Sequence, residues 1–161
     1  MTHSHHHANT LRVRHALWGL QKETLTALKQ EFDRENGYET TPTEWFQALM
    51  GAERYVWLRE FTSLMADIDT LTELEFITDQ HAGVARAEIE RLLFEEPPHQ
   101  SEFGKQFRQL LMSGTELLPL HSQLKGHLQL LPEVNVSRDQ GQVERRNWQE
   151  EHRHQARKKR N

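Results

Sequence analysis

Hydrophobic residues along most of the chain recur at steps of three and four, the spacing that puts them on one face of an α-helix. The clearest stripe lies within residues 53–75 and consists of Trp57, Phe61, Leu64, Ile68 and Leu71. Similar stripes indicate further helical segments at residues 10–36, 78–95, 101–112 and 117–131. Leu outnumbers Ile and Val together by 21 to 9, and the β-branched runs typical of strands are missing. The pattern predicts an all-α fold.

Capping and turn residues divide the stripes where helices are expected to end. Thr41 suits the N-cap of a short helix that ends at Gly51, Pro42 suits its first position, and Glu44 can close a capping box. Gly37 accepts the left-handed conformation that ends the first helix. The same signals separate the later helices at Pro97-Pro98, Ser101, Ser113-Gly114 and Pro132. Short loops favour antiparallel neighbours, so we predict an up-and-down bundle of four main helices with one or two short extra helices.

The hydrophobic residues are concentrated in the middle of the chain. Of the 37 Leu, Ile, Val and Phe residues, 34 lie within residues 11–131. We therefore predict a His-rich polar N-terminal tail over 1–10, a helical bundle domain over 11–131, and a polar, basic, disordered C-terminal tail over 132–161. The net charge of −4 divides into −7 on residues 1–131 and +3 on the C-terminal tail. A negative body is not typical of a nucleic-acid-binding surface, so any such role falls to the tail.

Composition excludes several kinds of protein. No stretch approaches 18 apolar residues, so we expect no membrane span. The N-terminus has no apolar core of a secretion signal, and the chain has no Cys for disulfides, thiolate zinc sites or a cysteine nucleophile. These features favour a cytoplasmic protein.

A distinctive motif lies in the strongest stripe, where Trp-Leu-Arg at residues 57–59 is followed a few residues later by Leu and then Asp. Together with a Glu-rich first helix and the later Ser101-Glu102-Phe103-Gly104, it resembles a family of small uncharacterised bacterial all-helical proteins. Members of that family have Pro after the Arg, where this chain has Glu60. The resemblance covers residues 11–131 and implies a helical fold and a bacterial origin. It implies no activity, cofactor or catalytic residue.

The N-terminal histidines are candidate metal ligands. Imidazole nitrogens bind Zn, Ni and Cu, and four of them lie close together at His3, His5, His6 and His7. A solvated tail with adventitious metal affinity is the simpler interpretation, and we expect no other cofactor.

Two polar residues inside predicted helices are candidates for burial, Asp69 beside the hydrophobic stripe and His81 on an apolar helix face. A trio of Asp69, His81 and His121 from three helices is conceivable as a metal or catalytic site. A buried carboxylate or imidazole more often has a structural partner, so we predict structural roles for Asp69 and His81.

Aromatic residues crowd the segment from Trp45 to Phe61, more than a bundle core requires. Exposed Trp, Tyr and Arg are typical of the residues that dominate protein interfaces. We therefore predict a partner or dimer surface at Trp45, Arg54, Tyr55 and Arg59.

The last ten residues have five positive charges and no acid. Such basic ends bind phosphate backbones with little sequence preference. The candidate nucleic-acid contacts are Arg153, Arg157, Lys158, Lys159 and Arg160.

Enzyme signatures such as a phosphate-binding loop, a Gly-x-Ser-x-Gly elbow or a His-Glu-x-x-His pair are not found in the sequence. We therefore predict a non-enzymatic helical bundle that acts through a protein–protein surface, a homodimer being one form of it. The alternatives are a metal-binding protein that uses the N-terminal histidines and a nucleic-acid accessory protein that uses the basic tail. An enzyme built around Asp69 and His81 is the least favoured interpretation.

Overall fold

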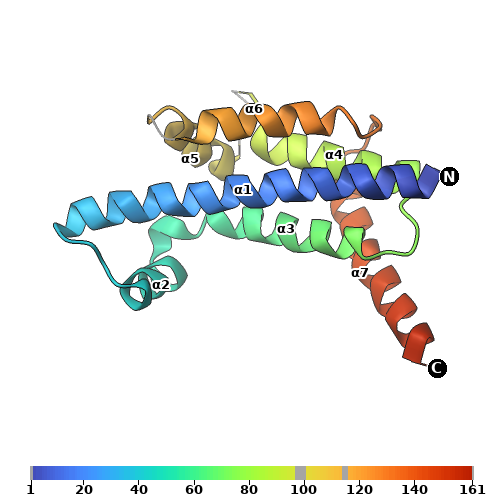
Figure 1. Ribbon diagram of the computed structural model, residues 1–161, viewed down its shortest axis with the longest axis horizontal. Coiled ribbons are helices and arrows are strands. Elements are labelled where there is room, and N and C mark those ends of the chain that lie inside the picture. Colours follow the sequence, from blue (N-terminus) through green and yellow to red (C-terminus); the bar gives the residue numbers. More distant parts are fainter. Residues whose placement is uncertain (1, 97–100, 114–115, 161) are drawn as a thin grey trace.

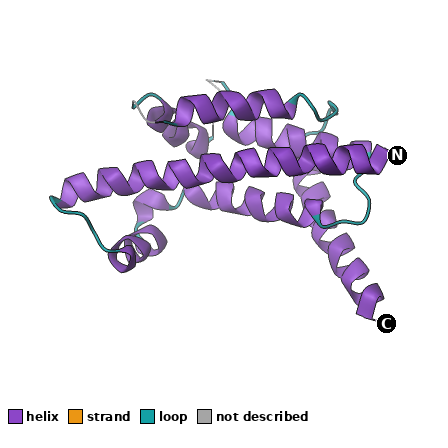
Figure 2. Cartoon of the chain, in the orientation of Figure 1, coloured by secondary structure: helices purple, strands orange, loops and turns teal. Residues whose placement is uncertain are grey.

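The computed structural model describes residues 2–96, 101–113 and 116–160, and for residues 2–4 it describes the backbone alone. The described residues form seven α-helices and one short 3₁₀ helix and contain no strand, which confirms the predicted all-α fold (Figure 1). Figure 2 shows that loops take up little of the chain. The elements are α1 (Thr2–Asn36), α2 (Pro42–Gly51), η1 (Glu53–Tyr55), α3 (Leu58–Thr72), α4 (Asp79–Leu93), α5 (Glu102–Leu111), α6 (Leu117–Leu128) and α7 (Arg138–Arg160).

The long helix α1 runs through the length of the molecule and contacts α3, α4 and α6 (Figure 1). Helices α4 and α7 pack against α3, α4 also contacts α5 and α7, and α5 contacts α6. Helix α2 lies to one side, below the C-terminal end of α1 in Figure 1. No helix in the described part of the chain is both long enough and apolar enough to cross a bilayer.

The core contains most of the stripe predicted in residues 53–75. Phe61, Ile68 and Leu71 are fully buried, and Leu64 is nearly so. Trp57 is only partly buried, because it precedes α3 and packs beside Phe103 at the edge of the core. Each fully buried side chain of this kind contributes about 1.5–3 kcal/mol relative to an exposed one, so this stripe fixes α3 in the bundle.

The predicted helix starts are confirmed by their hydrogen bonds. Thr41 and Glu44 form a reciprocal capping box at α2, with Pro42 in its first turn, and Ser101 accepts from the Gly104 N–H at α5. Gly37 adopts a φ of +79° and ends α1, a conformation that glycine reaches without a Cβ clash. The predicted breaks at Pro97-Pro98 and Gly114 lie outside the described residues.

The N-terminal residues differ from the expected tail because α1 begins at Thr2. Three polar side chains of this first segment, His6, Asn9 and Thr10, are buried and form hydrogen bonds. Thr10 Oγ1 donates to the His6 carbonyl at 2.6 Å, and Asn9 Nδ2 donates to the Leu130 carbonyl at 3.4 Å. These contacts extend α1 by more than two turns beyond the start that the hydrophobic pattern indicates.

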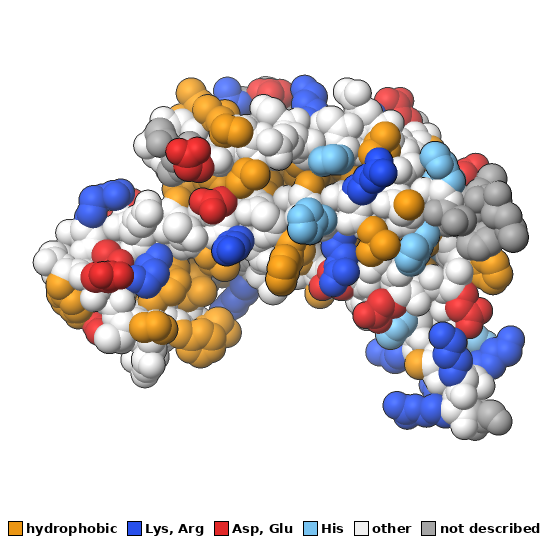
Figure 3. Space-filling view, in the orientation of Figure 1, with side chains coloured by type: hydrophobic (Ala, Val, Ile, Leu, Met, Phe, Trp, Pro, Cys, Tyr) orange, Lys and Arg blue, Asp and Glu red, His pale blue; other side chains and the backbone are white. Residues whose placement is uncertain are grey.

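The C-terminal residues also differ from the expectation, and disorder was the wrong prediction for residues 138–160, which form α7. Trp148 is 1% exposed and is the large apolar anchor of this otherwise polar helix. Val134 and Val136 in the preceding loop pack against the core. The folded unit therefore extends well beyond residue 131. Only the far end of α7 leaves the body, where Figure 3 shows a cluster of basic side chains.

Candidate functional site

Helix α2 exposes apolar side chains that the fold does not use. None of its residues is buried, although half of them are apolar. Phe46 is 61% exposed and Met50, one turn later, is 63% exposed. Val56 follows in the next turn of the chain and is 42% exposed. We call Phe46, Met50 and Val56 the α2 patch, and Figure 3 shows hydrophobic side chains gathered over this end of the molecule.

A groove begins at the α2 patch and runs between α1, α2 and α3. Its volume is about 410 Å³. Met50 and Val56 form part of its wall, and apolar residues from all three helices line it, namely Leu25, Leu49 and Leu58. Gln21, Arg59 and Thr62 provide its polar positions. We call it the α2 groove, and its mostly apolar lining suits the side chains of another protein chain.

Aromatic packing fixes α2 against α1. The Trp45 ring contacts Phe32 at a centroid distance of 5.4 Å and meets Tyr55 edge to face at 5.2 Å. Arg54 donates to both oxygens of Glu35 at 2.6 and 3.0 Å and lies over the Tyr55 ring at 4.9 Å. This bidentate bond raises the pKa of Arg54 and lowers the pKa of Glu35. The arrangement holds the α2 patch in one orientation.

The predicted interface residues therefore have different positions. Tyr55 is only 3% exposed, so the expectation that it offers contact surface is wrong, and it supports α2 from beneath. Trp45 is partly buried and Arg54 is occupied by Glu35. Arg59 is exposed and lines the α2 groove as predicted for a surface residue. The two most exposed apolar side chains of α2, Phe46 and Met50, were not among the predicted interface residues.

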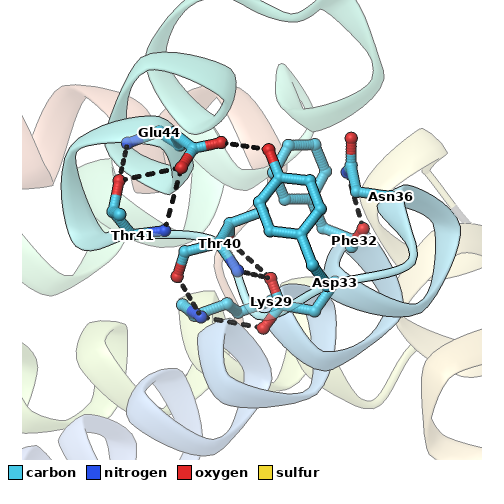
Figure 4. Close-up of polar contacts among 8 residues, drawn as sticks. Lys29, Phe32, Asp33, Asn36, Thr40, Thr41 and Glu44 are labelled. Atoms are coloured by element: carbon cyan, nitrogen blue, oxygen red, sulfur yellow. Dashed lines mark hydrogen bonds and ion pairs between the residues drawn. The ribbon is translucent and has the colours of Figure 1, made fainter.

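A polar cluster closes the corner between α1 and α2 (Figure 4). Asp33 accepts from Lys29 at 2.8 Å, from the Thr40 N–H at 3.1 Å and from the Thr40 hydroxyl. These bonds, the Lys29 ammonium first, lower the pKa of Asp33 from 3.8 to about 2. Tyr38 donates to Glu44 at 2.5 Å, which lowers the pKa of Glu44 and raises that of Tyr38. The cluster sets the angle at which α2 leaves α1.

The N-terminal histidines lie on α1, and two of them have protein partners. His6 Nε2 donates to Asp79 Oδ1 at 2.5 Å, and His5 shares a hydrogen bond with Asn9 at 3.3 Å. His7 is half-buried, and the His3 side chain lies outside the described residues. The residues with described side chains contain no group of three or more metal-ligating residues placed to hold a metal ion. Metal binding by this tract stays a prediction.

Asp69 and His81 are not brought together. Asp69 accepts from Arg14 Nε at 2.6 Å and is 42% exposed, so its predicted burial is wrong. His81 is 15% exposed and closes the Thr78 capping box of α4, and its Nε2 lies 3.3 Å from Glu151. His121 donates instead to the Leu93 carbonyl at 2.8 Å, and burial lowers its pKa. The three groups have separate structural partners, as the structural interpretation predicts for Asp69 and His81.

The acids of α3 and α4 that meet α7 are the partly buried Asp67 and the buried Glu88. Arg145, 8% exposed, donates to Asp67 Oδ2 at 2.6 Å and to Glu88 Oε1 at 3.2 Å. Arg91 donates to the other oxygen of Glu88, and Gln149 donates to Asp67 Oδ1 at 3.0 Å. This network joins α3, α4 and α7. Sequence reasoning missed it because its partners lie 57 to 82 residues apart.

The basic end of α7 has little contact with the body. The five predicted nucleic-acid contacts are exposed, and Arg153 pairs with Glu150 on the same helix. The last four cations, Arg157 to Arg160, form the terminal turn. Cations there also interact favourably with the negative end of the helix dipole, which is a sufficient structural reason for part of this cluster.

Comparisons with known protein families, with curated proteins and with solved structures find no match to this chain.

Proposed function

We propose that the protein is a binding module that acts through the α2 patch and the α2 groove. The observation that supports this most directly is a helix with no buried residue and two large apolar side chains more than 60% exposed. Exposed apolar groups beside an apolar groove are typical of protein interaction sites. The proposal involves no catalytic step.

A second copy of this chain is the occupant that we favour. Helix α2 contains no Lys or Arg, and its single acid, Glu44, is occupied by Thr41 and Tyr38. Near the axis of a two-fold symmetric contact a residue meets its own counterpart, so a patch without free charge avoids repulsion between copies there. Phe46 and Met50 of one copy are of a size and character to enter the apolar groove of the other.

Sedimentation of the full chain tests the proposal. We expect a concentration-dependent dimer for the wild type, and a Phe46→Ser/Met50→Ser variant whose dimer dissociates about 1,000-fold more readily, since two apolar anchors worth about 2 kcal/mol each contribute about 4 kcal/mol. Both side chains point to solvent in the monomer, so circular dichroism and the melting temperature should be unchanged at a dilution at which the wild type is also monomeric.

The matched control is Met112→Ser, because Met112 is 73% exposed at the end of α5 and lies outside the α2 patch and groove. It should dimerise like the wild type. A wild type that stays monomeric up to on the order of 100 μM, or a double variant that dimerises normally, would contradict the proposal.

A second candidate function is contact with nucleic acid through α7. It is favoured by four consecutive exposed cations, Arg157 to Arg160, on a helix end that projects from the body (Figure 1). For the wild type we expect DNA binding that is measurable at about 50 mM salt and weaker at about 200 mM. Replacing the four cations with Gln should abolish this binding. The control removes four exposed cations elsewhere, at Arg12, Lys22, Arg34 and Lys105. Equal loss in both variants would mean that α7 has no special role.

A further inference from the structure

A second cavity, separate in its lining from the α2 patch, lies between α3, α4 and the N-terminal ends of α5 and α7. Its volume is about 350 Å³. Four arginines line it, against two acids, Glu60 and Glu88. We call it the arginine cavity, after Arg59, Arg91, Arg138 and Arg145.

The two inner arginines are held in place by the buried network. Arg145 is fixed by Asp67 and Glu88, and Arg91 by Glu88 and by the Val136 carbonyl, to which it donates at 2.9 Å. Glu88 is 4% exposed and receives both guanidinium groups. Because these charges compensate each other, the inner wall is rigid and needs no ligand to be stable.

The two outer arginines, Arg59 and Arg138, have fewer and more distant ion-pair partners. Arg59 is exposed and has no ion pair among the described residues. The Arg138 side chain is 62% exposed, and its guanidinium lies 3.8 Å from Glu95, longer than a hydrogen bond. A cation whose partners are distant can turn toward a ligand at little cost. The outer pair is therefore held less firmly than the inner pair and can contribute charge to a ligand.

Two helix N-termini reinforce this charge. Ser101, the N-cap of α5, lines the cavity, and so do Arg138 and Gln142 from the first turns of α7. Ser137 and Gln140 cap α7 reciprocally at 3.0 and 3.2 Å. The N-terminal end of a helix carries a partial positive charge and favours anions. The outer guanidinium groups and the helix ends thus favour the same kind of ligand, an anion.

From this arrangement we infer that the arginine cavity binds a small phosphate-bearing molecule. Its arginines approach from α3, α4 and α7, so an ion with oxygens in several directions can meet all of them, whereas a planar carboxylate offers two oxygens in one plane. The guanidinium fork matches phosphate oxygens in pairs. A volume of about 350 Å³ lies at the small end of ligand pockets, which favours a phosphate ester or diphosphate over a larger cofactor.

Calorimetric titration of the full chain with inorganic pyrophosphate tests the inference. We expect saturable one-to-one binding, weakened about tenfold by Arg138→Gln and by Arg59→Gln, since each removes a charge-assisted hydrogen bond. Neither residue holds the fold together, so the melting temperature without ligand should not change. Arg146→Gln is the matched control, because Arg146 is exposed on the same helix and does not line the cavity.

Two further measurements separate the alternatives. Malonate, a dianion with two planar carboxylates in place of tetrahedral phosphates, should bind more weakly than pyrophosphate, and equal binding would overturn the assignment to phosphate. The Phe46→Ser/Met50→Ser variant should keep its affinity, although Arg59 also borders the α2 groove. Loss of binding in that variant would place the site at the dimer contact. Absence of binding, or equal loss in Arg146→Gln and Arg138→Gln, would overturn the inference.

Discussion

Helices α2 and α7 show opposite relations between composition and burial. Helix α2 is half apolar and buries none of its residues. Helix α7 has 23 residues, of which only Val143, Trp148 and Ala156 are apolar, yet it buries Gly141, Arg145 and Trp148. Burial in this protein therefore follows the contacts that a helix makes with its neighbours rather than the hydrophobicity of the helix.

The difference also separates structural from binding residues. Helix α7 is held by one aromatic anchor, a close backbone approach and a buried ion-pair network, so its polar residues stabilise the fold. Helix α2 is held by Trp45 and by the corner cluster, so Phe46 and Met50 are free for a partner. Three predictions test this contrast.

The largest effect is expected from Trp148→Ala. Removing the indole side chain of a fully buried Trp leaves a cavity and abolishes its hydrophobic burial. Together these effects should lower the free energy of unfolding by about 3–5 kcal/mol. Denaturant unfolding of the full chain measures it. Val143→Ala, on the same helix but 48% exposed, should change the free energy by less than about 0.5 kcal/mol. Equal effects of the two variants would mean that α7 is not part of the cooperative fold.

A smaller effect is expected where α7 approaches α4. A Cβ atom on Gly141 would lie 2.4 Å from Glu88 Oε2, inside the buried network. Gly141→Ala should therefore cost about 1–3 kcal/mol, although Ala is the better helix former. Gly126→Ala in α6 is the control, because no atom lies within 4 Å of its added Cβ, and it should stabilise by about 0.5–1 kcal/mol. Stabilisation by both variants would contradict the close approach.

The smallest effect is expected at the corner that holds α2. The lowered pKa of Asp33 means that its carboxylate stabilises the native state above pH 3.8, and that this stabilisation is lost as the pH falls toward about 2. Asp33→Asn should be less stable than the wild type near neutral pH, and the difference should shrink below pH 3.8. Acid titration of unfolding measures it, with the exposed neighbour Glu39→Gln as the charge control. A difference independent of pH would show that Asp33 does not act through its charge.

Sequence patterns predicted the local features well. The capping box at Thr41 and Glu44, the cap at Ser101 and the α3 stripe depend on residues within a few positions of each other, so periodicity and spacing contain the information. The exposed side of α2 was harder to predict, because an apolar helix usually faces the core. Crowding of aromatic residues led to the prediction of an interface near Trp45, one residue from the exposed Phe46, and that interface stays a prediction.

Tertiary partners explain what the sequence patterns missed. Arg145 can be buried because its guanidinium pairs with Asp67 and Glu88. These acids lie 78 and 57 residues away in the chain, so no local spacing predicts the contact. Asp67 and Asp69 point to nearly opposite sides of α3, so which of them meets Arg145 depends on the side on which α7 packs. The first turns of α1 have no apolar stripe, and their polar contacts with Asp79 and Leu130 form only in the folded protein.

The pairing of α1 with α6 has a consequence for the order of folding. The first helix of the chain is covered by α6, Leu117–Leu128, which lies about a hundred residues later. During synthesis the side of α1 that packs against α6 stays uncovered until about three quarters of the chain has been made. Contacts of such long sequence separation slow folding and leave apolar surface open to aggregation in the meantime. A nascent chain that stops before residue 117 therefore leaves the side of α1 that faces α6 exposed.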